Sequence, residues 1–95
     1  MKFFAQIIDW FRQRSLSDLD RRLRSGPITS SLDFEAGDKT CRQEAWLGLQ
    51  DDWYALVIEQ TTGEGWETVT STEFRSLDEM ARYLAKHTKF VISDF

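Results

Sequence analysis

From Ile28 to Thr72 apolar and polar residues alternate with a period of two, and short runs containing Gly or Asp interrupt the alternation. Successive side chains in a strand point to opposite faces, so this period is typical of strands with one buried face. The pattern predicts four strands joined by tight turns, over residues 28–34, 41–49, 53–60 and 66–72. Hairpin turns of this length predict antiparallel pairing.

The predicted strands differ in how their apolar residues are arranged. In the strand over residues 41–49, one face carries Ala45, Leu47 and Leu49, and the other carries Glu44, Trp46 and Gly48. Residues 53–58 are apolar on both faces. A strand that is apolar on both faces is typical of the interior of a sheet, so this strand is predicted to be central.

Helical spacing replaces the period of two near both ends of the chain. Apolar residues recur every three or four positions over residues 2–14 and 16–24, as one bent helix or two short ones, before Gly26-Pro27 ends the region. Ser76 and Glu79 form a predicted capping box that opens a helix over residues 77–87. The apolar run at residues 90–92 predicts a short final strand.

Together these elements predict an α+β fold. Its mostly antiparallel sheet has about four to five strands, packed with an N-terminal helix and a helix in the C-terminal half. A chain of 95 residues has the length of one domain, so residues 1–95 are predicted to form a single domain.

Charge is distributed unevenly along the chain. The net charge at pH 7 is -4, which argues against a nucleic-acid binder, because such proteins usually carry a basic excess. Residues 1–42 carry a net charge of +2 and residues 43–95 a net charge of -6. Between Gln43 and Phe74 there are seven carboxylates, no Lys or Arg, and three of the four tryptophans.

This acidic segment is the predicted site of partner binding. Carboxylates without nearby cations attract a basic partner, and tryptophan is enriched among the residues that dominate interface energy. The predicted partner-binding residues are Glu44, Trp46, Asp51, Asp52, Glu59, Glu64, Trp66, Glu67 and Glu73. The alternative interpretation is that the acids are solvated outer-face residues and the tryptophans belong to the core.

Residues that enzymes and metal sites depend on are scarce. A single Cys and a single His exclude an internal disulfide and most His-based zinc sites. Asp51 and Asp52 are neighbours on a turn and point in different directions, which disfavours a catalytic pair. Cys41 and His87 are more simply a packed thiol and a helix-end cation than a nucleophile and its base. We therefore predict no enzymatic activity, no cofactor and no metal.

The first residues set the expected compartment. Gln6 and Asp9 interrupt the apolar residues and Arg12 ends them, unlike a signal peptide. We expect a cytoplasmic protein with a reduced Cys41, as a monomer or weak homodimer. The aromatic N-terminal segment has an alternative role on a membrane surface, but packing on the sheet is the simpler expectation because a small domain needs that apolar area.

Residues 46–95 resemble small bacterial immunity proteins. The similarity lies in four stretches, Trp53–Glu59, Gly65–Glu67, Phe74–Met80 and Phe90–Phe95. These immunity proteins are the cognate antitoxins of polymorphic and contact-dependent growth inhibition toxins, and the group that the chain resembles is the TriTu immunity proteins. The resemblance implies a protein that binds one toxin domain, often a nuclease, and blocks it.

Charge and resemblance lead to the same expected function. Nucleases are basic because their substrate is polyanionic, so an acidic face suits them. We predict an immunity protein that binds and neutralises a cognate basic toxin domain of RNase type through an acidic, Trp-bearing face. The alternatives are an acidic adaptor or regulatory domain with a non-toxin partner, acting as a nucleic-acid mimic, and a small enzyme that works through its carboxylates.

Overall fold

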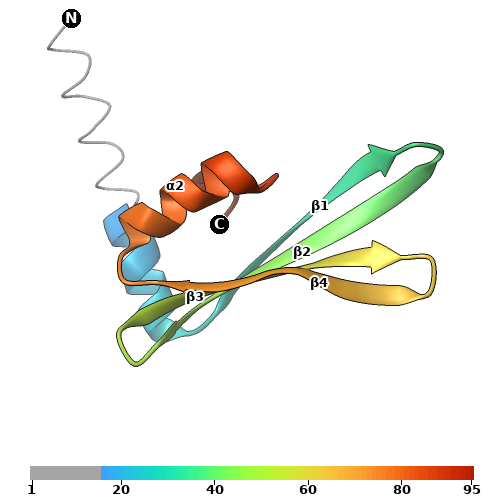
Figure 1. Cartoon of the computed structure of the whole chain (residues 1–95). Coiled ribbons are helices and arrows are strands. Elements are labelled where there is room, and N and C mark those ends of the chain that lie inside the picture. Colours follow the sequence, from blue (N-terminus) through green and yellow to red (C-terminus); the bar gives the residue numbers. More distant parts are fainter. Residues whose placement is uncertain (1–15) are drawn as a thin grey trace, which may run out of the picture.

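The structure, a computed structural model, describes residues 16–95, which contain a four-stranded sheet in the order β1-β2-β3-β4 (Figure 1). The strands are β1 (Ile28–Ala36), β2 (Lys39–Gln50), β3 (Trp53–Thr62) and β4 (Gly65–Phe74). Each strand pairs antiparallel with the next. The predicted antiparallel sheet is confirmed, and β3 lies inside it as its apolar sequence indicated. The helix predicted over residues 2–14 lies outside the described residues.

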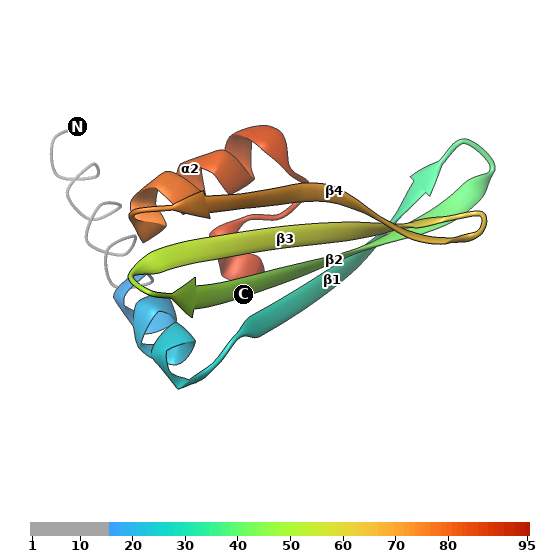
Figure 2. The same cartoon turned by 60° about the horizontal axis from the view of Figure 1, so that its bottom comes forward.

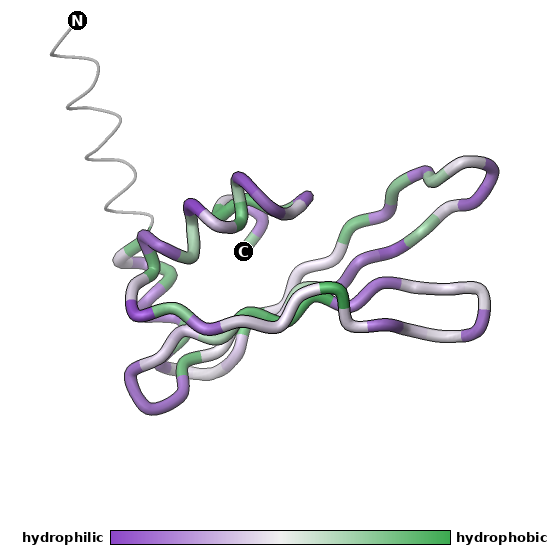
Figure 3. Tube along the Cα trace, in the orientation of Figure 1, coloured by the Kyte–Doolittle hydropathy of each residue, from purple (hydrophilic) through white to green (hydrophobic). Residues whose placement is uncertain are grey.

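Two-residue turns join the strands, so the strands run further than the alternation predicted. Asp51 and Asp52 both have positive φ, at 49° and 69°. This backbone suits the right-handed twist of paired strands, and Asp tolerates it better than most residues. All three turns are hydrophilic (Figure 3). The turns joining β1 to β2 and β3 to β4 extend beyond the helices at one end of the sheet (Figure 1).

Helices flank the strands in sequence, as predicted. Residues 16–25 are helical, and α2 spans Leu77–His87. At the start of α2 the Ser76 hydroxyl accepts a hydrogen bond from the Glu79 N–H at 3.2 Å, which is one half of the predicted capping box. The helix ends at His87, and the following residue, Thr88, caps it by donating its N–H to the Leu84 carbonyl at 3.1 Å.

The predicted final strand over residues 90–92 is wrong. The chain instead forms a short 3-10 turn, η1 (Ile92–Asp94). The Asp94 carboxylate accepts a hydrogen bond from the Val91 N–H at 2.8 Å, and the Thr88 hydroxyl accepts one from the Phe90 N–H at 3.0 Å. In a strand, the N–H groups of Phe90 and Val91 would bond to an adjacent strand. Here nearby side chains accept these bonds, so the segment does not pair with the sheet.

The core lies between one face of the sheet and the helices. It contains Leu19 and Leu23 from the first described helix, Ala45, Leu47, Leu56 and Ile58 from β2 and β3, Leu77, Met80 and Leu84 from α2, and Phe90. The core residues of β2 and β3 alternate along each strand, so they share one side of the sheet. Figure 2 shows α2 and the C-terminal segment on that side, which confirms an α+β fold.

A polar contact fixes the first described helix to β3. The Tyr54 hydroxyl donates to Asp20 Oδ1 at 2.5 Å, and Arg24 Nε lies 3.0 Å from Asp20 Oδ2. The hydrogen bond from Tyr54 is the main reason that the pKa of Asp20 is lowered, with a smaller contribution from Arg24. Burial, followed by the bond to Asp20, raises the pKa of Tyr54.

This contact predicts a loss of stability in acid. The folded pKa of Asp20 lies below its ordinary value of 3.8, so the unfolded state takes up the proton first as the pH falls from about 5 to about 3. Tyr54→Phe is expected to lower the free energy of unfolding by about 1 kcal/mol at neutral pH and to flatten this acid-dependent decline. Urea unfolding across that pH range measures both effects. Tyr83→Phe is the matched control, because the Tyr83 ring packs against Phe74. This variant should leave the dependence of the unfolding free energy on pH unchanged.

Candidate functional site

The side of the sheet opposite the core is its open face, which the described helices leave uncovered. Directly paired residues of antiparallel strands share a face, so the register assigns its members. They are Thr29, Ser31, Asp33 and Glu35 on β1; Thr40, Arg42, Glu44, Trp46, Gly48 and Gln50 on β2; Trp53, Ala55, Val57, Glu59 and Thr61 on β3; and Trp66, Thr68, Ser71 and Glu73 on β4.

Charge separates between the two sides of the molecule. Among the described residues, the strand positions of the open face carry five carboxylates and one guanidinium, and Arg75, just after β4, adds a second guanidinium beside Trp53. The helices and the C-terminal segment, residues 16–25 and 77–95, carry six Lys or Arg and five Asp or Glu. The open face is therefore negative while the helices and the C-terminal segment are nearly neutral, so the open face will attract cations more strongly than they do.

The structure divides the nine predicted partner-binding residues among different places. Five of them lie on the open face, namely Glu44, Trp46, Glu59, Trp66 and Glu73. Asp51 and Asp52 form the turn between β2 and β3, close to the first described helix (Figure 1). Glu64 lies in the turn between β3 and β4, at the opposite end of the sheet. Glu67 pairs with Gln60, which places it on the helical side.

Two arginines lie on the open face although the acidic segment of the sequence contains none. Arg42 is 3.4 Å from Glu44 Oε1 and 3.5 Å from Asp33 Oδ1. The Arg75 guanidinium lies 3.9 Å from the centroid of the Trp53 ring, close enough for a cation–π interaction. The expectation of a face without Lys or Arg is therefore wrong, because residues just outside the segment fold back onto it. The alternation of strand residues predicts that Arg42 and Glu44 lie side by side on one face. No sequence pattern predicts that Arg75, which follows the last strand, lies on this face.

The Trp46 indole lies over Gly48 on the open face, because Gly48 has no side chain to occupy that space. A Cβ atom at Gly48 would meet the indole, closest to Cη2 and 2.7 Å from Cζ2. The ring therefore lies flat over the backbone of Gly48, which is itself buried.

Gly48→Ala is expected to displace the Trp46 indole from the sheet while leaving the fold intact. The added methyl occupies the place of the ring, and the ring can move because it is the end of a side chain. The indole N–H signal of Trp46 in a ¹⁵N-correlated NMR spectrum should shift, with amide shifts confined to neighbouring β2 and β3 residues. An unchanged indole signal would contradict the contact, and Gly63→Ala, with open space around it, is the control.

A hollow of about 580 Å³ indents the open face where β1, β2 and β3 adjoin. Trp46 and Val57, a directly opposed pair, contribute to its lining. Glu44 and Glu59 form the next opposed pair of the open face and also line it. Like charges directly opposite one another destabilise a sheet. Arg42 pairs with Glu44, whereas Glu59 has no ion-pair partner within residues 16–95.

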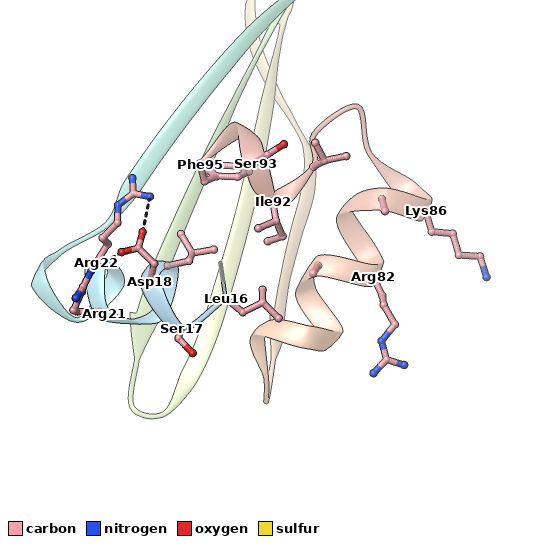
Figure 4. Close-up of a pocket in the computed structure, with 14 residues that line it drawn as sticks. Leu16, Ser17, Asp18, Arg21, Arg22, Arg82, Lys86, Ile92, Ser93 and Phe95 are labelled. Carbon is pink, nitrogen blue, oxygen red and sulfur yellow. Dashed lines mark hydrogen bonds and ion pairs between the residues drawn. The ribbon is translucent and has the colours of Figure 1, made fainter. Parts of the chain in front are cut away.

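A second, larger groove of about 1480 Å³ lies on the helical side (Figure 4). It runs between the first described helix, α2 and the C-terminal segment, with Arg21, Arg22, Arg82 and Lys86 among its lining residues. Three of these cations already have carboxylate partners, either Asp18 or Asp78. Leu16, the first described residue, is part of the lining of the groove. The volume given therefore refers to the groove formed by residues 16–95 alone.

No protein-family model, curated protein or solved structure matches the chain. Within residues 16–95, no set of three or more His, Cys, Asp or Glu side chains is arranged to hold a metal ion. The helices in that range are too short or too polar to cross a membrane.

Proposed function

We propose that this protein is a non-enzymatic immunity protein that neutralises a basic toxin domain, a nuclease of RNase type, by binding it through the open face. The observation that carries the proposal is the opposed pair Glu44 and Glu59, which lies on the sheet face that the described helices leave uncovered. In the free protein this pair is unfavourable, because two carboxylates face each other and Arg42 is close to only one of them. A cationic partner relieves the repulsion and adds attraction of its own.

Aromatic residues on the same face support a protein partner. Trp66 is 48% exposed, and Trp46 and Trp53 are partly exposed. Tryptophan buries a large area with few rotatable bonds, and it is enriched at the energetic centres of interfaces. A face that combines such rings with carboxylates matches a partner that is both cationic and protein in nature.

A nuclease is the kind of toxin that best fits this face. Its substrate is a polyanion, so its binding surface is basic and complementary to the carboxylates. The resemblance of residues 46–95 to immunity proteins supports the same role. In this role the protein acts in the cytoplasm, where the nucleic acid to be protected lies, and it needs neither a cofactor nor a metal.

The decisive experiment pairs the full chain with the toxin domain encoded beside it in its genome. We expect a stable complex in size-exclusion chromatography at about 0.1 M salt, where exposed charges still attract over several ångströms. We also expect RNA cleavage by the toxin to stop at one equivalent. Absence of a complex would contradict the proposal. A complex with a neighbouring protein that is not toxic would favour the acidic adaptor instead.

A further inference from the structure

We infer that the hollow on the open face receives an arginine side chain from the partner. The inference rests on the proposed function and makes its contact chemistry specific. The hollow is lined by Trp46 and Val57, by the carboxylates of Glu44 and Glu59, and by the hydroxyl-bearing residue Ser31. It thus combines an apolar surface for the stem of a long side chain with acceptors for a charged head group.

The charge of the hollow is negative after its own cation is counted. Arg42 lines the hollow and contacts Glu44 at 3.4 Å and Asp33 at 3.5 Å, and it donates to the Ser31 hydroxyl at 2.9 Å. Its guanidinium is therefore already bound by residues of β1 and β2. Glu59, on the β3 side, has no ion pair among the described residues. The unbalanced carboxylate favours a cation that approaches from solvent.

The shape of the site favours a guanidinium over an ammonium. Arginine is planar, stacks on aromatic rings and presents a fork of N–H donors that matches a carboxylate, whereas lysine is a compact and strongly hydrated charge. The open face already holds a guanidinium in this way, because Arg75 stacks over Trp53 at 3.9 Å. Trp46 offers a second indole, which lies over Gly48. Glu59 is two residues along β3 from Val57, the aliphatic residue that pairs with Trp46, so its carboxylate is on the same face as the indole.

The test titrates the full chain with three small probes and follows the indole and amide signals by NMR. The probes are N-acetyl-arginine methylamide, the corresponding citrulline compound, which has nearly the same shape without the charge, and the corresponding lysine compound. We expect saturable shifts of the Trp46 indole and of β2 and β3 amides with arginine in the millimolar range. The lysine compound should bind several-fold more weakly and the citrulline compound not measurably.

Two variants locate the binding site. Glu59→Gln should weaken arginine binding at least about threefold, because it removes the unpaired charge while keeping the size of the side chain. Glu67→Gln removes a carboxylate from the adjacent strand but from the helical side of the sheet, so arginine binding should not change. Equal effects of both variants, or equal binding of arginine and lysine, would overturn the inference.

The two proposals fail in different ways. A toxin that is bound and neutralised while arginine does not shift Trp46 would remove the arginine site and leave the function in place. Saturable arginine binding without any complex with the neighbouring toxin would keep the site and overturn the function.

Discussion

Replacing Phe90 with alanine is expected to lower the free energy of unfolding by about 3 to 5 kcal/mol. The ring is fully buried, in the same core cluster as residues of β2, β3 and α2. It also packs against Phe95, with ring centroids 5.8 Å apart. Truncation to alanine leaves a cavity in the core and removes the contacts through which the C-terminal segment packs on the sheet and α2. Domains of this size have a total stability of roughly 5 to 15 kcal/mol, so the variant approaches the limit of folding.

Urea unfolding followed by circular dichroism measures the loss. Val91→Ala is the matched control, because it truncates the adjacent residue, whose side chain is 45% exposed. We expect a change within about 0.5 kcal/mol for that variant, as for most surface substitutions. A similar loss in both variants would mean that the C-terminal segment is held by its backbone hydrogen bonds and not by the buried ring.

The sheet was predictable from sequence because one of its faces is buried. Burial imposes the period of two, and that period correctly placed Ala45 and Leu47 on the face opposite Glu44 and Trp46. The apolar run at residues 90–92 was too short to show any period. There the local hydrogen bonds of Thr88 and Asp94 decide the conformation, and such bonds leave little trace in hydrophobic patterning.

The candidate site was predictable in part. Trp66 and Glu67 were both assigned to it, but adjacent residues of a strand point to opposite faces, and a β-bulge decides which of the two lies on the open face. The register of β3 and β4 shifts between Ile58 and Glu59, so the pairs change from Ile58 with Thr70 to Glu59 with Thr68. A bulge adds one residue to one strand and reverses the facing of all residues beyond it. Without the shift Glu67 would pair with Thr61 on the open face, and Trp66 would lie on the opposite face. The sequence shows no sign of this extra residue.

Stability and binding are expected to change in opposite directions when Glu59 is replaced by lysine. The new cation lies directly opposite Glu44, so an unfavourable like-charge pair becomes a favourable cross-strand pair. We expect the free energy of unfolding to rise by about 0.5 kcal/mol. The same change removes negative charge from the hollow, and association with the basic toxin should slow by about tenfold at low salt, with a weaker dependence on salt concentration.

Stopped-flow association kinetics at two salt concentrations, together with urea unfolding, test both halves of this expectation. Glu67→Lys makes the same charge change on the helical side of the same sheet, and it should alter the association rate much less. A damaged fold would lower stability and binding together. If Glu59→Lys is more stable but binds more slowly, the slower association is due to the changed charge on the open face. Equal slowing by Glu59→Lys and Glu67→Lys would instead mean that the toxin responds to the net charge of the protein and not to this face.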